Sequence, residues 1–194
     1  MKISAPQADE LTGNSWFSGH TDGVELHEAP VTVDEFDAEA RCEERDELET
    51  AVFGGGLTVA GTLDLGTDVH AIYVVRGALR ARRLVLGDAV LVVDGVVEVD
   101  EWLFGGVTEG LFEVAGHQAE SPTGPDALLA HVRGPVVALY DRARREFVLR
   151  KGGSPRTVAD LVPQVRDGLD PDLREEISIA ANLRARLIAG DPIF

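Results

Sequence analysis

Histidine and cysteine are the residue types in this chain best suited to catalysis or metal binding, but their spacing supports neither role. No two histidines stand four residues apart or form a His-x-His pair, which are spacings that metal sites use. The histidines are His20, His27, His70, His117 and His131. Cys42 is the only cysteine, and with no histidine near it in the sequence a catalytic thiol would lack its base. We therefore expect no catalytic residue, no metal and no cofactor.

The glycine-rich segments do not indicate an enzyme either. Phe53-Gly54-Gly55-Gly56 is similar to a phosphate loop but lacks the following Lys-Ser/Thr and leads into a predicted strand, not a helix. Neither a Gly-x-Ser-x-Gly elbow nor a dinucleotide-binding fingerprint is present. A small-molecule-binding or enzymatic β-helix stays open as an alternative, and it would need a pocket that the sequence does not reveal.

The charge of the chain is strongly negative and unevenly distributed. The 194 residues carry a formal net charge of −16, and residues 1–50 hold 14 acidic and 3 basic side chains. Nucleic acid and anionic membrane are poor partners for such a surface, whereas opposite charge steers the encounter with a basic protein. A polar segment follows Met1 and no apolar run is long enough to span a membrane, so we expect a cytoplasmic protein.

The middle of the chain repeats the pattern Val-x-Gly-x-(Leu/Val). Successive glycines are 16, 18, 21 and 18 residues apart in five copies, which begin at Val59, Val75, Val93, Val114 and Val132. The match between the second and third copies extends from Leu84–Gly87 to Trp102–Gly105, again 18 residues apart. A single strand–bend–strand coil cannot bury its own apolar face, whereas stacked coils place alternate residues inside. Residues 55–140 are therefore predicted to form a β-solenoid, that is, a β-helix of stacked coils.

A hairpin meander, as in a sandwich or barrel, is the alternative, but it does not require nearly constant glycine spacing. The predicted fold is mainly β, with a polar, loop-like arm over 1–23, a β-solenoid body over 24–150 and a helical C-terminal cap over 151–194. Apolar spacings of three and four predict the helices of the cap, with a restart at Pro163 and a second helix beginning at Asp170-Pro171. An open solenoid end exposes strand edges, so we expect the helices to cover an end.

Residues 34–52 allow two interpretations. Phe36, Ala38, Ala40 and Cys42 alternate with acidic residues, which favours a strand followed by a turn of helix over Glu43–Val52. Acid–arginine pairs at a spacing of four support a helix over the whole segment instead.

Partner-binding residues are predicted on this acidic segment and beside the glycine-rich loop at 105–110. Trp102 and Phe104 replace the smaller residues of the preceding copy, so they either fill a wider part of the core or form an apolar anchor on the coil face. The predicted binding residues are Asp34, Glu35, Asp37, Glu39, Glu43, Glu44, Asp46, Glu47, Trp102, Phe104 and Glu109.

The Val-x-Gly-x-Leu coils resemble bactofilin-type polymer-forming proteins, which are cytosolic bacterial β-helices that assemble end to end. That resemblance implies a self-assembling scaffold. The small size, acidity and lack of catalytic residues also resemble the immunity proteins of bacterial polymorphic toxins, which implies binding and neutralisation of a basic toxin domain. We expect the second function, with a monomer or homodimer favoured over a filament because unequal coils and a helical tail work against stacking.

Overall fold

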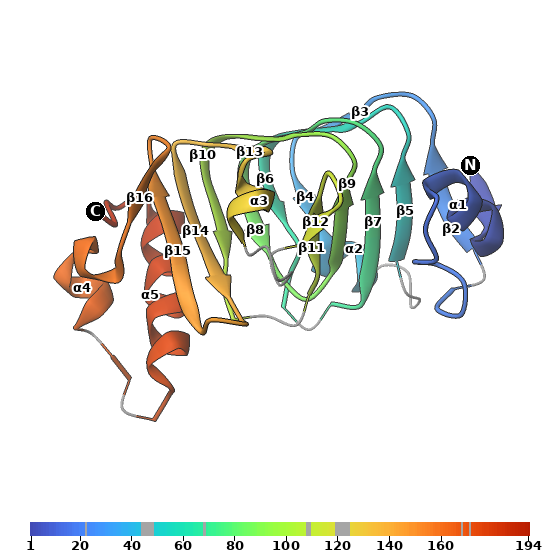
Figure 1. The fold of residues 1–194 in the computed structure, drawn as a ribbon. Coiled ribbons are helices and arrows are strands. Elements are labelled where there is room, and N and C mark those ends of the chain that lie inside the picture. Colours follow the sequence, from blue (N-terminus) through green and yellow to red (C-terminus); the bar gives the residue numbers. More distant parts are fainter. Residues whose placement is uncertain are drawn as a thin grey trace.

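The computed structural model describes residues 1–21, 23–43, 49–67, 69–107, 110–118, 125–167, 169–170 and 172–194. It shows a mainly β protein built on a β-solenoid of about four turns, as the sequence predicts. The coils stack side by side from the N-terminal elements to the C-terminal helices, and the two termini lie at opposite ends of the stack (Figure 1). The parallel stack begins at β2 and ends at β14, so it extends N-terminally beyond the coils predicted over residues 55–140.

Two sheets form the walls of the solenoid. In sheet A, neighbouring strands from β2 to β11 run parallel, and β1 and β12 pair antiparallel at the two edges. In spatial order its strands are β1 (Lys2–Ser4), β2 (Gly23–His27), β5 (Glu49–Phe53), β7 (Ala71–Val75), β9 (Val90–Val93), β11 (Phe112–Val114) and β12 (His117–Gln118).

A register shift partway along the long strands divides sheet B into two halves, one formed by the first part of each strand and the other by the second part. The short strands β3 (Val31–Val33) and β4 (Phe36–Asp37) pair with the first and second halves of β6, so each coil bends between its two halves. The other strands of sheet B, in spatial order, are β6 (Leu57–Asp64), β8 (Leu79–Leu86), β10 (Val97–Gly105), β14 (Val136–Asp141), β15 (Glu146–Lys151) and β16 (Ser154–Arg156), with β13 (Val132–Arg133) on the first half of β10.

The main core lies inside the coils, where equivalent residues stack on one another. Leu57, Leu79 and Val97 are in register on neighbouring strands and are all buried. Opposite them, Tyr73 and Leu91 are paired in sheet A and belong to the same apolar cluster. Alternation along each strand therefore places every second side chain in this core, which is the basis of the prediction from the repeats.

The register corrects three of the predicted repeat alignments. Phe53, not Val59, lies beside Val75, because Gly61 falls at the shift within β6 rather than at a corner of the coil. Trp102 pairs with Arg83 instead of Leu84, since β10 has one more residue than β8 at the bend. The copy at residue 132 is also out of register, because Val132 pairs with Val97 and not with Val93.

The N-terminal arm covers the outer face of sheet A. It was predicted to be loop-like, but it contains β1 and the helix α1 (Ala5–Thr12). Ser4 and Gln7 form a capping box at the start of α1, which satisfies backbone amides there. Phe17 is fully buried against the outward-facing valines of sheet A, so it anchors the arm on this face.

The C-terminal segment covers the outer face of the second half of sheet B. It consists of a 3-10 helix η1 (Val158–Asp160), α4 (Pro163–Arg166) and α5 (Glu175–Ala189). The restart at Pro163 and the stop at Gly190 agree with the sequence, but α5 begins later than Asp170. The expected position was wrong: Ile179, Leu183 and Leu187 pack on the side of the solenoid, not over an end, because the outward residues of this face are themselves apolar.

Other elements close the C-terminal end of the stack. The short helix α3 (Pro125–Leu129) inserts two fully buried leucines, Leu128 and Leu129, into the core beyond the last coil. Sheet B continues into the antiparallel strands β15 and β16, and Pro155 in β16 cannot donate a backbone hydrogen bond to a further strand. Among the described residues, no helix has the length and apolar character needed to cross a membrane.

The acidic segment after β3 folds differently from the favoured prediction. Strand structure ends at Asp37, and Ala38–Glu43 form the helix α2. The Asp37 carboxylate accepts a hydrogen bond from the Ala40 amide, so it stabilises the start of this helix. The predicted helical turn over Glu43–Val52 is wrong from Glu49 onward, where β5 begins, and residues 44–48 lie outside the described part of the chain.

Candidate functional site

The acidic residues predicted to bind a partner lie together along the edge of sheet B at the N-terminal end of the solenoid. We call this surface the acidic edge and define it by five exposed residues on β4, α2 and the turn between β3 and β4. They are Asp34, Glu35, Asp37, Glu39 and Glu43. Figure 1 shows that β3, β4 and α2 lie next to the first full coil. Three other predicted residues, Glu44, Asp46 and Glu47, fall outside the described residues.

Two carboxylates of the acidic edge also hold the local structure. Glu35 accepts the backbone amide of Thr62 at 2.5 Å, and its carboxyl group occupies the space that a side chain at position 61 would need. Asp37 caps α2. Asp34, Glu39 and Glu43 form no side-chain hydrogen bond or ion pair with the described residues. These three carboxylates are therefore free to pair with cations from outside the molecule.

A buried polar cluster fastens α2 to the core behind the acidic edge. The Glu49 carboxylate is fully buried and accepts hydrogen bonds from Arg41 Nε and from the Tyr73 hydroxyl, both at 2.6 Å. Burial, together with the hydrogen bond to Glu49, raises the pKa of Tyr73 well above its usual range, so this hydroxyl stays protonated and donates. The Arg41 guanidinium also lies 4.8 Å from the centre of the Phe36 ring.

Several acidic residues elsewhere on the body are paired with arginines. Arg80, Glu98 and Arg133 form a ladder across β8, β10 and β13, and Glu101 pairs with both Arg82 and Arg83. The hydrogen bond from Arg80 holds the pKa of Glu98 below its usual range, and the hydrogen bond from Arg83 does the same for Glu101.

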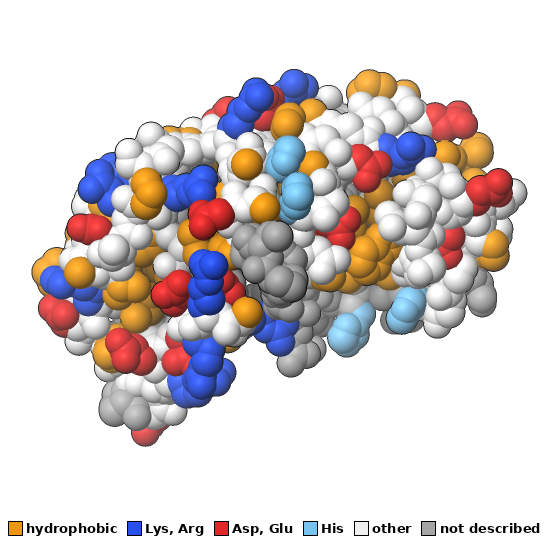
Figure 2. Space-filling view, viewed as in Figure 1, with side chains coloured by type: hydrophobic (Ala, Val, Ile, Leu, Met, Phe, Trp, Pro, Cys, Tyr) orange, Lys and Arg blue, Asp and Glu red, His pale blue; other side chains and the backbone are white. Residues whose placement is uncertain are grey.

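Blue and red side chains alternate in the same way over the C-terminal part of the face in Figure 2. Glu176 with Arg145 and Asp126 with Arg150 are examples of such pairs in the C-terminal part of the chain. Unpaired acids such as Glu10 and Asp100 also occur elsewhere among the described residues, but the acidic edge gathers three of them beside two structural carboxylates on β4, α2 and the turn before β4.

The two predicted aromatic anchors lie on the outer face of sheet B and are buried beneath the C-terminal segment. Trp102 is 6% exposed and Phe104 3% exposed, and both belong to the cluster that includes α5. Their burial agrees with the interpretation in which they fill a core, although this core is outside the coils. An anchor role would require α5 to move. Glu109 lies outside the described residues.

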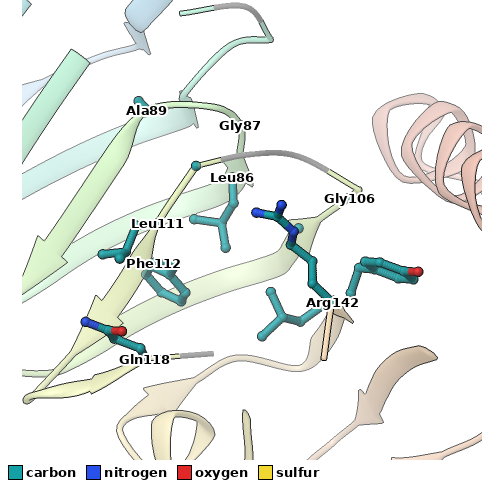
Figure 3. A pocket seen from close by; sticks show the side chains of 12 residues that line it. Leu86, Gly87, Ala89, Gly106, Leu111, Phe112, Gln118 and Arg142 are labelled. Carbon is teal, nitrogen blue, oxygen red and sulfur yellow. The ribbon is translucent and has the colours of Figure 1, made fainter. Parts of the chain in front are cut away.

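A small cavity lies beside Gly105, Gly106 and Gly110. Leu86, Phe112 and Leu139 line it, and Gln118 and Arg142 add polar groups. Figure 3 shows the Arg142 side chain reaching over the cavity towards Leu86 and Gly106. The volume of about 50 Å³ admits a few water molecules and is well below that of a typical metabolite site.

No protein-family model matches this chain, and no match was found among the curated proteins or the solved structures. The chemistry of the site therefore has to be inferred from this chain alone. Among the described residues, no group of three or more histidine, cysteine, aspartate or glutamate side chains is placed to hold a metal ion. The His117 and His131 rings stack 5.4 Å apart, as a pair without a third ligand of this kind.

Glu49 and Tyr73, which hold the helix of the acidic edge, were not predicted as functional residues from the sequence. A signal for Glu49 was present, because Glu49 alternates with Ala51 and Phe53 in a strand whose odd positions face inward. An acidic residue at an inward position predicts a buried polar partner. Tyr73 gave no comparable signal, since a tyrosine in an apolar strand also fits an ordinary core.

Proposed function

We propose that this protein is a non-catalytic binding protein that uses the acidic edge to capture a basic protein, as an immunity protein does with a basic toxin domain. The observation that carries the proposal is the cluster of unpaired carboxylates on one edge of the solenoid. Acids over much of the body have arginine partners, whereas Asp34, Glu39 and Glu43 have none among the described residues. Uncompensated carboxylates raise the association rate of a cationic partner and select against anionic ones.

The acidic edge also offers a docking surface of defined shape. The strand β3 is the last strand of sheet B at this end, and the register places the backbone groups of Val31 towards β6 and those of Thr32 away from it. Val31 and Val33 are half-buried beside the carboxylates. Backbone groups, an apolar contact and negative charge are thus available within one surface.

The test is a charge reversal that avoids the two structural carboxylates. Replacing Asp34, Glu39 and Glu43 with lysine should abolish rescue of growth when the cognate basic toxin is expressed, and should slow association at low salt about ten-fold or more. A matched control replaces Glu10, Asp167 and Asp172, three exposed acids distant from the edge, and changes the net charge by the same amount.

Association rates measured by surface plasmon resonance at several salt concentrations would separate the outcomes. The proposal holds if the association rate and its salt dependence fall only in the variant of the acidic edge. Equal losses in both variants would mean that net charge alone steers binding, and no loss in either would mean that the acidic edge is only a solvated surface.

End-to-end assembly is disfavoured by the features of the two ends. Pro155 blocks the sheet B edge at one end, α3 closes the core there, and the acidic edge would repel its own copy at the other. We expect light scattering on the eluting protein to give a mass of 20.8 kDa that does not grow with concentration. A mass that increases with concentration would favour the scaffold function instead.

A further inference from the structure

A groove on the outer face of sheet B has the dimensions of a small-molecule site. It lies between the strands and the end of α5, and its volume is about 350 Å³, within the usual range of about 300–1,000 Å³ for such sites. The floor takes one residue from each of four adjacent strands: Arg83, Trp102, Val136 and Lys151. The wall is apolar and includes Leu187, Ile193 and Phe194.

The groove carries a cation at each end of its floor. Arg83 and Lys151 are separated by three strand spacings, or about 14 Å, with the Trp102 ring between them. The Arg83 guanidinium lies 5.9 Å from the centre of the Trp102 ring, and the Lys151 ammonium lies 5.6 Å from the centre of the Phe194 ring. Aromatic faces and cations thus alternate along the groove.

No acidic side chain of the groove is paired with Lys151. Both acidic side chains that line the groove already have arginine partners: Glu101 pairs with Arg82 and Arg83, and Asp191 pairs with Arg186. Lys151 is exposed and forms no ion pair with the described residues. The chain contains only two lysines, Lys2 and Lys151, and the second of these, at the end of β15, lines this groove.

We propose that the groove binds a small amphipathic anion, with a carboxylate or sulfonate head paired to Lys151 and a flat apolar body lying over Val136 and the exposed margin of Trp102. A charge-assisted contact at one end and apolar contacts along the floor are the combination that fixes such ligands in protein pockets. The overall charge of −16 repels anions from most of the surface, so an anion that binds does so where the local charge is positive. This inference is independent of the acidic edge and would stand if that proposal failed.

The probe for the test is 8-anilinonaphthalene-1-sulfonate, which has a sulfonate head and a flat aromatic body. The two tryptophans give two indole N–H signals in a proton–nitrogen NMR spectrum, and the Trp16→Phe variant assigns them. We expect the Trp102 signal to shift saturably with probe while the Trp16 signal stays in place. Lys151→Gln should weaken the affinity about ten-fold, as expected for loss of one charge-assisted contact. The matched control Lys2→Gln should leave the affinity unchanged.

A second probe and a second variant make the test decisive. N-phenyl-1-naphthylamine, which has the same body without the sulfonate, should bind wild type about ten-fold more weakly. Val136→Phe, which narrows the groove from its floor, should reduce binding of both probes. Equal affinity of the two probes, full affinity in Lys151→Gln, or a shift of the Trp16 signal in place of Trp102 would each overturn the proposal. Lys151 is exposed, and unchanged dispersion of the remaining signals would show that its variant is folded.

Discussion

Replacing Gly87 with alanine should lower the free energy of unfolding by about 3 kcal/mol or more. Gly66, Gly87 and Gly110 form a column at one corner of the solenoid, where successive coils touch through their backbones. A Cβ atom at Gly87 would overlap the carbonyl oxygen of Gly66, and one at Gly110 would overlap that of Gly87. Because the obstacle is backbone and not a side chain, the coils must separate, and the hydrogen bond from the Asp88 amide to Gly66 weakens with them.

Thermal and urea unfolding of Gly87→Ala would measure this effect, and the expected fall in the melting temperature is about 6–12 °C. Gly134→Ala is the matched control, because its added Cβ would lie 3.4 Å from the nearest atom, the Val99 carbonyl oxygen. The control should change stability by less than about 1 kcal/mol and in either direction. Similar losses in the two variants would show that the stacking at this corner is loose enough to take a methyl group.

The fold class followed from the sequence because the second and third coils keep both features of a solenoid. Val75 and Val93 occupy equivalent corners, and the residues after them alternate inward and outward with the same period. The register failed at the first coil, because Gly61 imitates the corner glycine while lying at the bend within β6. One glycine can serve either a corner or a bulge, and pattern alone does not distinguish the two.

The placement of the terminal segments could have been inferred from the composition of the strands. Val52, Val74 and Val92 point outward, yet they are as apolar as the inward residues beside them. A strand that is apolar at consecutive positions is buried on both faces. This pattern predicts that other elements cover the sides of the solenoid. The expected position of the C-terminal helices, in contrast, was based only on the need to cover an open end.

The acidic edge was predictable in composition but not in shape. Alternation of Phe36 and Ala38 with acids suggested a strand, but Asp37 caps a helix at the next residue, and this short-range hydrogen bond outweighs the period of two. The groove at Lys151 could not be predicted from the sequence, since its floor is assembled from four strands and its wall from residues near 190. Long-range assembly of this kind leaves no local pattern in the sequence.

Replacing Arg41 with methionine should lower the free energy of unfolding by about 3 kcal/mol. The Glu49 side chain has no exposed surface, so its carboxylate would keep only the hydrogen bond from Tyr73 and would lose its counter-charge. Methionine retains an apolar contact with the Phe36 ring, which limits the loss to the electrostatic effect. The expected value is at the lower end for a broken buried pair, because Arg41 itself is 31% exposed. Arg76→Met is the matched control, since the Arg76–Asp94 pair is exposed on both sides and should contribute less than about 1 kcal/mol.

The double variant Arg41→Met/Glu49→Gln tests the cause. A neutral amide needs no counter-charge and still accepts the Tyr73 hydroxyl, so the second substitution should restore part of the stability lost by the first. Urea unfolding followed by tryptophan fluorescence would measure all of these variants. The Glu49 charge would not be the source of the destabilisation in either of two cases. In the first, Arg41→Met lowers the free energy of unfolding by no more than Arg76→Met does; in the second, adding Glu49→Gln lowers it further. Since α2 carries Glu39 and Glu43, the Arg41–Glu49 pair also determines how firmly the acidic edge is held for a partner.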